Sequence, residues 1–276
     1  MCLIAFAFDA HPECALVLAA NRDEFYDRPT TPAHFWEGTP GLLAGRDERA
    51  GGTWMGVTRG GRFAALTNVR AVAEQQGERR TNVPSRGGLV KAFLTDERSP
   101  RAFLTALSER AGRYNGFNLL AGTFGTEEPR LAHFSTHDDV PPVPVAPGVH
   151  GLSNASLDTP WPKVERATAG LERLLDENRI SPEALLRLLD DRTPAPADAL
   201  PDTGVPPDLE RALSPVFIQT DGYGTRSSTA LLVGRSGAVT FVERSFATGR
   251  SFEEESSPAD RRFSFQIEPV PARPAP

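Results

Sequence analysis

Two apolar segments near the beginning of the chain constrain its fold more than any other feature. Residues 2–8 and 15–20 are apolar at every position, and Asp-Ala-His-Pro-Glu between them is typical of a turn. Side chains of a strand alternate between its two faces, so a strand that is apolar on both faces must be covered on both sides. The sequence therefore predicts two neighbouring strands inside a layered structure.

Further along the chain, pairs of predicted strands alternate with pairs of predicted helices. Arg59-Gly60-Gly61 joins two strand segments in a hairpin pattern, and the spacing of Leu171, Leu174 and Leu175 is helical. The short connections within strand pairs indicate antiparallel neighbours. We therefore predict an α+β fold, a four-layer αββα sandwich of two antiparallel sheets. The further predicted strands are 53–58, 62–67, 117–123, 130–135, 227–233 and 238–245, and the predicted helices are 85–94, 100–110, 161–178 and 181–190.

Length and composition favour one large domain. The chain has 276 residues, of which 39% are hydrophobic, so we expect a single domain over residues 1–268. A loop at 194–207 with five prolines and a Pro-rich tail at 269–276 complete the chain. The formal net charge of −6 argues against a nucleic-acid partner and against an anionic membrane surface.

The beginning of the chain resembles neither a signal peptide nor a membrane span. The opening apolar run has seven residues, no basic segment precedes it, and it ends at Asp9. Two cysteines, Cys2 and Cys14, are too few for a disulfide scaffold. We expect a soluble, cytoplasmic protein.

The position of Cys2 favours a nucleophile. A small residue at position two allows removal of Met1, which would make Cys2 the amino terminus. Its α-amine, with a pKa of about 7.7–8.0, could then act as the base for its own thiol. The alternative interpretation is that Cys2 is a small apolar residue at the start of a buried strand.

Polar residues follow the second apolar segment directly, as Asn21-Arg22-Asp23-Glu24. If the two segments pair, these residues lie near Cys2. A carboxylate there could orient the α-amine, and an arginine could lower the pKa of the thiol. The alternative is a solvated turn at the end of a strand.

Three later clusters also interrupt or end apolar segments. Asn68 and Asn154 carry amide groups, which are common side-chain donors to the oxyanion of acyl transfer, although a cap or turn role is the alternative. Arg226 could bind a substrate carboxylate or support a thiolate, and its alternative role is in a surface turn. The clusters are Leu66-Thr67-Asn68, Gly151-Leu152-Ser153-Asn154 and Tyr223-Gly224-Thr225-Arg226-Ser227.

Taken in order, these motifs resemble the NRDE family, whose animal members are called transport and Golgi organization protein 2. The resemblance spans roughly residues 1–245 and rests on eight ordered blocks. Besides Cys2, the NRDE tetrad and the three clusters above, the blocks are Gly51-Gly52-Thr53-Trp54, Ser85-Arg86-Gly87 and Tyr114-Asn115-Gly116-Phe117-Asn118.

The family is in turn similar to cysteine N-terminal nucleophile hydrolases, such as choloylglycine hydrolase and penicillin V acylase. In those enzymes the arginine and aspartate after the second strand are separated by two residues, whereas Arg22 and Asp23 are adjacent here. Adjacent side chains on an extended segment point in opposite directions, which leaves open which of the two faces Cys2. The site residues that the resemblance implies are Cys2, Arg22, Asp23, Asn68, Asn154 and Arg226.

The resemblance implies hydrolysis of a small linear amide, or a related acyl transfer, by processed Cys2, with no cofactor. The alternative is a non-catalytic binder of haem or an acyl lipid in the same cleft, since haem trafficking and acyl-lipid handling have been proposed for animal members. A third possibility is an autoprocessing scaffold with neither role. His133 and His137 have the spacing of two metal ligands on a helix, but their segment has a strand-then-turn pattern, so we expect no metal.

Overall fold

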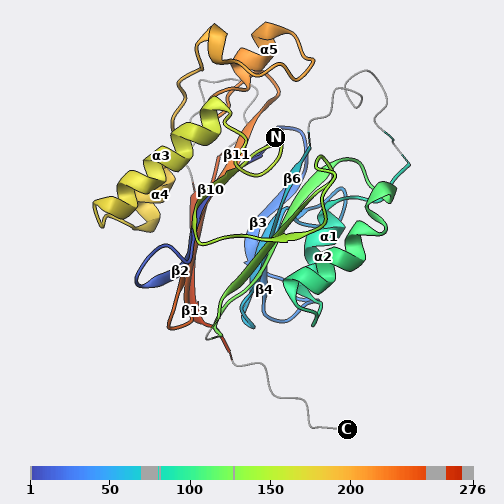
Figure 1. Ribbon diagram of the computed structural model, residues 1–276, viewed down its shortest axis with the longest axis vertical. Helices are drawn as coiled ribbons and strands as arrows, with labels where there is room; N and C mark the ends of the chain where they lie inside the picture. The colour runs from blue at the N-terminus through green and yellow to red at the C-terminus, as the bar shows by residue number, and fades with distance from the viewer. Residues whose placement is uncertain (1, 70–79, 81, 127, 247–258, 269–276) are drawn as a thin grey trace.

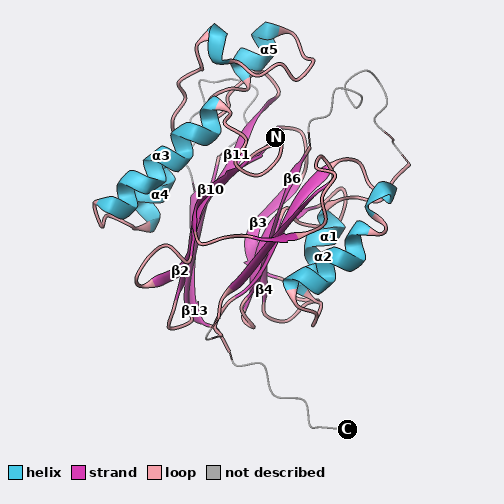
Figure 2. Ribbon diagram, in the orientation of Figure 1, coloured by secondary structure: helices cyan, strands magenta, loops and turns pink. Residues whose placement is uncertain are grey.

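The computed structural model describes residues 2–69, 80, 82–126, 128–246 and 259–268. Met1 and the predicted tail at 269–276 lie outside the described residues. Two β-sheets pack face to face, and helices cover the outer face of each (Figures 1 and 2). Every strand pair in the described part of the chain is antiparallel. The predicted four-layer αββα sandwich is confirmed.

The two apolar segments lie in the first sheet, whose strand order is β10-β1-β2-β11-β12-β13. The central position of β1 and β2 explains their composition, because each has a strand on both sides and a layer above and below. The bounds are β1 (Cys2–Phe8), β2 (Cys14–Phe25), β10 (Gly148–Leu152), β11 (Tyr223–Gly234), β12 (Ala238–Ser245) and β13 (Ala259–Gln266).

The second sheet has the same order in space as in sequence, β3-β4-β5-β6-β7-β8-β9. Most of its neighbouring strands follow one another through short connections, whereas two helices separate β6 from β7. The bounds are β3 (Thr30–Phe35), β4 (Leu42–Asp47), β5 (Met55–Thr58), β6 (Arg62–Asn68), β7 (Phe117–Thr123), β8 (Arg130–Ser135) and β9 (Val143–Pro144).

The helices form the two outer layers. α1 (Gly87–Leu94) and α2 (Pro100–Ser108) cover the second sheet, and α3 (Pro162–Asp176) and α4 (Pro182–Leu188) cover the first (Figure 1). All four predicted helices are present, with ends within a few residues of those expected. The shorter helices are η2 (Ala111–Arg113), η3 (Ala197–Ala199) and α5 (Pro207–Ala212). None of the described helices combines the length and the apolar character needed to cross a membrane.

The side chains of β1 show how the layers are filled. Ile4, Phe6 and Phe8 point between the two sheets, where they join the central core. The alternate positions Leu3, Ala5 and Ala7 pack against α3 and α4. A third core lies between the second sheet and α1 and α2. The prediction that both faces of this strand are buried is confirmed.

Two strands are longer than the sequence suggested. β2 continues to Phe25, so the tetrad at 21–24 lies inside a strand and not in a turn after it. β11 begins at Tyr223, so the cluster at 223–227 is also part of a strand. The reason is mutual pairing, because Tyr223 lies opposite Phe25 and the ladder runs on from there. The polar residues of both strands therefore have fixed positions.

Candidate active site

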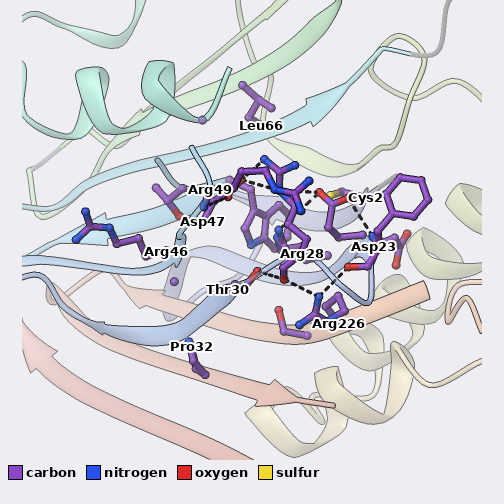
Figure 3. Close-up of a pocket in the computed structure, with 18 of the residues that line it drawn as sticks. Cys2, Asp23, Arg28, Thr30, Pro32, Arg46, Asp47, Arg49, Leu66 and Arg226 are labelled. Atoms are coloured by element: carbon purple, nitrogen blue, oxygen red, sulfur yellow. Dashed lines mark hydrogen bonds and ion pairs between the residues drawn. The ribbon is translucent and has the colours of Figure 1, made fainter. Parts of the chain in front are cut away.

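A cleft of about 590 Å³ lies between the two sheets, at the end where β1 begins (Figure 3). The first sheet contributes residues of β1, β2, β11 and β12, and the second sheet contributes residues of β4, β6 and the connections near residues 53 and 86. Of the six site residues predicted from the sequence, five line this cleft: Cys2, Arg22, Asp23, Asn68 and Arg226.

Cys2 is the first residue of β1 and lies on the face that points between the sheets, as Ile4 does. It is 9% exposed. Burial raises the pKa of the Cys2 thiol. The charge of Arg22 and a hydrogen bond from the backbone N–H of Asp23 lower the pKa but do not outweigh burial. Arg22 thus acts in the direction expected from the sequence, but desolvation of the thiolate is the larger effect, so the pKa of the thiol is raised overall.

The register of β1 and β2 decides which charged residue shares the face of Cys2. Cys2 lies opposite Arg22, so the Arg22 side chain leaves the sheet on the same face as the thiol. Arg22 is 7% exposed, and its Nη2 lies 3.7 Å from Oε2 of Glu24. Its Nη1 is buried and has no hydrogen-bond partner among the described residues.

The side chain of Asp23 leaves β2 on the face opposite to that of Cys2 and Arg22, where Thr225 fixes its position. The hydroxyl of Thr225 donates a 2.7 Å hydrogen bond to Oδ1 of Asp23. Burial raises the pKa of this carboxyl, and the charge of Lys163 and the bond from Thr225 act against that rise. Asp23 is thus a buried carboxyl group with a fixed position at the edge of the cleft.

The two asparagines are connected to each other. Nδ2 of Asn154 donates a 2.7 Å hydrogen bond to the backbone carbonyl of Asn68. Asn68 is exposed in the cleft at the end of β6, whereas Asn154 is only 1% exposed and lies behind the lining. Next to Asn154, the hydroxyl of Ser153 donates a 3.0 Å hydrogen bond to the Cys2 carbonyl. This loop therefore fixes both the start of β1 and the end of β6.

Arg226 enters the cleft because of an irregularity in β11. The register of β11 against β2 shifts between Thr225 and Ser227, which is the mark of a β-bulge at Arg226. Nη1 of Arg226 donates to the carbonyls of Phe25 and Arg28, at 2.8 and 3.0 Å (Figure 3). Its buried Nε has no hydrogen-bond partner within the described ranges.

Several residues near the site were not predicted. Thr225 and Ser153 belong to two of the polar motifs identified in the sequence, so the motifs indicated the right segments but not these side chains. Lys163 is one of only two lysines in the chain, which is a weaker signal. Glu243 is a buried carboxyl group on the cleft floor, where it accepts a 2.6 Å hydrogen bond from the N–H of Ala33 in the second sheet. The sequence signal for Glu243 is its spacing, because it follows Val239 and Phe241 at alternate positions and so lies on the inward face of β12.

Neither His133 nor His137, the two histidines with the spacing of metal ligands, lines this cleft. His133 is buried on β8, and burial lowers its pKa to about 4, while His137 follows the strand in a turn. Over the described ranges, no group of three or more His, Cys, Asp or Glu side chains is arranged to hold a metal ion.

Comparisons with known proteins give the relationships of the chain. A model of the family described as Transport and Golgi organisation 2 matches residues 1–248. The Bos taurus transport and Golgi organization protein 2 homolog is 38% identical over 264 residues, which cover 89% of this chain and 93% of that protein. The Homo sapiens homolog is 36% identical over 262 residues, with coverage of 89% and 93%.

Among solved structures, the Caenorhabditis elegans N-acylethanolamine-hydrolyzing acid amidase ortholog is similar. Its TM-score is 0.48 at 12% identity, and the match covers 83% of this chain and 92% of that chain.

Proposed function

The chain belongs to the Transport and Golgi organisation 2 family, and we propose that it hydrolyses a small linear amide, or transfers its acyl group, with the Cys2 thiol as nucleophile. One observation supports this proposal above all others. A cysteine near the beginning of the chain lies in a cleft, with Arg22 directly opposite and Asp23 held rigidly next to it. Buried charged groups beside a nucleophile are typical of catalytic sites.

The first half of the reaction requires removal of Met1, which frees the α-amine of Cys2. The neutral amine takes the proton of the thiol while sulfur attacks the carbonyl carbon, and the C–S bond forms as the carbonyl oxygen becomes an oxyanion. When this intermediate collapses, the C–N bond breaks and the leaving amine receives the proton from the α-ammonium group. The product of this half is a thioester on Cys2.

The second half returns the enzyme to its starting state. The α-amine takes a proton from water as the water oxygen attacks the thioester carbonyl. The C–S bond then breaks, the acid is released, and the thiolate regains the proton from the ammonium group. With an acceptor amine or alcohol in place of water, the same steps transfer the acyl group.

In this scheme each polar residue near Cys2 has a separate role. Asp23, fixed by Thr225, orients the α-amine. The Asn68 amide donates to the oxyanion, and Asn154 either donates as well or fixes Asn68 through its carbonyl. Arg22 and Arg226 supply positive charge on the cleft side. The raised pKa of the buried thiol favours proton transfer to the amine at the moment of attack over a permanently ionised sulfur.

The second candidate function is binding of haem or an acyl lipid without catalysis. Aromatic and apolar residues on the cleft wall favour it: Trp54, Leu66 and Phe246 line the cleft, and Phe25, also in the lining, is 57% exposed. The charged groups in the same lining fit a small polar substrate better, because pockets for apolar ligands are mostly apolar.

The decisive experiment combines intact mass with turnover. Mass spectrometry of the purified protein establishes whether Met1 is removed. A panel of N-acyl amides and a haem titration are then measured for the wild type, Cys2→Ser and Cys2→Ala. As a hydrolase, the protein loses turnover with either substitution, since a serine hydroxyl is much harder to ionise than a thiol. Absence of turnover on every amide, together with saturable haem binding that survives Cys2→Ala, would support the binder instead.

A further inference from the structure

The cleft at Cys2 carries positive charge although the protein as a whole is negative. The formal net charge of the chain is −6. Among the described residues that line the cleft there are six arginines and four carboxyl groups, with no lysine. The arginines are Arg22, Arg28, Arg46, Arg49, Arg86 and Arg226, and the carboxyl groups are those of Asp23, Glu24, Asp47 and Glu243.

The carboxyl groups leave much of this positive charge uncompensated. Asp47 is committed to Arg28, with Nη2 and Oδ2 2.6 Å apart (Figure 3). Glu24 is shared at 3.7 Å between Arg28 and Arg22. Asp23 points to the far side of β2, where it accepts from Thr225, and Glu243 accepts a hydrogen bond from the N–H of Ala33 in the second sheet.

Two of the arginines, Arg22 and Arg226, lie close together in the cleft lining, and Glu24 is an acidic neighbour of both. Arg22 pairs with Ser227 across the β2–β11 ladder, and the bulge puts Arg226 next to that position. The charge of Arg22 lowers the pKa of Arg226, after the larger effect of burial, as expected for neighbouring cations. Nη1 of Arg22 and Nε of Arg226 are both buried with no hydrogen-bond partner in the described part of the chain. Unsatisfied buried N–H groups of like-charged side chains are costly in a free protein.

From this arrangement we infer that the substrate carries an anionic oxygen group, a carboxylate or a phosphate, which binds at Arg22 and Arg226 beside the scissile carbonyl. Arginine forms bidentate, charge-assisted hydrogen bonds with both groups. Arg49 is exposed in the cleft lining and adds attraction for an incoming anion. The inference rests on the proposed function for the position of the carbonyl, whereas the anion site rests on the arginines alone.

Matched substrates test this inference. We would measure kcat/KM for N-octanoylglycine, for its neutral counterpart N-octanoylglycinamide and for the phosphate-bearing N-octanoylphosphoethanolamine. The wild type should prefer one of the anionic substrates over the neutral one by about tenfold or more. Which anion is preferred separates a carboxylate site from a phosphate site. Arg22→Gln and Arg226→Gln should each reduce the preference, and Arg173→Gln on the exposed side of α3 should leave it unchanged.

Binding to Cys2→Ala separates this inference from the proposed function. Calorimetry with N-octanoylglycine and N-octanoylglycinamide reports anion binding without turnover. If no amide is hydrolysed but the variant binds only the anionic compound, the hydrolase proposal fails and the anion site stands. If the neutral amide is hydrolysed and bound as well as the anionic ones, or if the preference survives both arginine substitutions, the inference is overturned and the hydrolase proposal stands.

Discussion

Cys2 and Arg22 lie directly opposite each other in neighbouring antiparallel strands, so both side chains leave the sheet on the same face. The apolar residues that follow Cys2 and precede Arg22 hold this register, because a slip by one residue would turn each buried side chain to the wrong layer. The same slip would put Asn21 or Asp23 opposite the thiol. The position of the guanidinium group is therefore fixed by the core of the sheet.

Thr225→Val tests the support behind Asp23. The threonine hydroxyl donates to Oδ1 of Asp23 and accepts from the N–H of Ile218, at 2.7 and 3.0 Å. Valine keeps the shape but leaves both groups without this partner, which should cost about 1–3 kcal/mol in unfolding free energy. We also expect a roughly tenfold loss of turnover, since general acid–base catalysis depends on position.

Urea unfolding and kcat/KM on an N-acyl amide check this prediction. The matched control is Thr126→Val, which removes a hydroxyl that donates to the Glu128 carbonyl on the surface. An effect on stability with no effect on turnover would show that Asp23 does not orient the amine.

The sequence predicted the fold well where apolar patterns are strong and poorly where strands are polar. β1 and the first half of β2 were clear because all side chains of residues 2–8 and 15–20 are buried. The strands β3, β4, β9, β10 and β13 were missed. Of the edge strands among them, β3 contains Pro32 and is mostly half-buried, and β13 is largely exposed. Edge strands need no alternating apolar face, so their sequences resemble loops.

For the site, the sequence identified candidate residues but not their orientation. That Arg22 and Asp23 point in opposite directions follows from strand alternation, whereas the choice of Arg22 for the face of Cys2 required the register. The bulge at Arg226 and the burial of Asn154 behind the cleft depend on contacts between segments far apart in the chain. No local pattern reports such contacts.

Asn154→Ala tests the asparagine pair. If Asn154 donates to the oxyanion, turnover should fall by on the order of 10²–10³. The substitution also leaves the Asn68 carbonyl without its donor, at a cost of about 1–3 kcal/mol in unfolding free energy. Asn154→Asp keeps the shape and removes the donor, so both variants should lose turnover. Turnover close to the wild-type value in either variant would exclude the oxyanion role.

Gly224→Ala tests the packing that holds the beginning of β11. A Cβ at this position would lie 2.4 Å from the hydroxyl oxygen of Tyr26 and 2.5 Å from the backbone carbonyl of Ile218. The tyrosine could move, but the backbone carbonyl could not move without shifting the strand that carries Arg226. We expect a loss of about 1–3 kcal/mol in unfolding free energy. Gly88→Ala in α1, where a Cβ meets no atom within 4 Å, is the control and should be neutral or stabilising.

His133 should make the protein less stable in acid. Burial lowers the pKa of His133 to about 4, whereas the unfolded chain has an ordinary histidine pKa of about 6.5. Below about pH 6.5 the unfolded state therefore binds a proton that the folded state does not, and the unfolding free energy falls as the pH decreases towards 4. The charges of Asp138 and Asp158 act in the opposite direction but do not outweigh burial. The contribution of this one side chain should reach about 3 kcal/mol.

His133→Leu isolates that contribution, because the buried Nε2 of His133 has no hydrogen-bond partner among the described residues and an apolar side chain suits the site. Urea unfolding of the wild type and the variant between pH 7 and pH 4 should give curves that separate as the pH falls, with the variant the more stable in acid. His150 contributes with the opposite sign, since its hydrogen bond to Asp158 raises its pKa, and it is unchanged in both proteins. His137→Asn, at an exposed position, should follow the wild type. Parallel curves for His133→Leu and the wild type would mean that His133 is protonated in the folded protein.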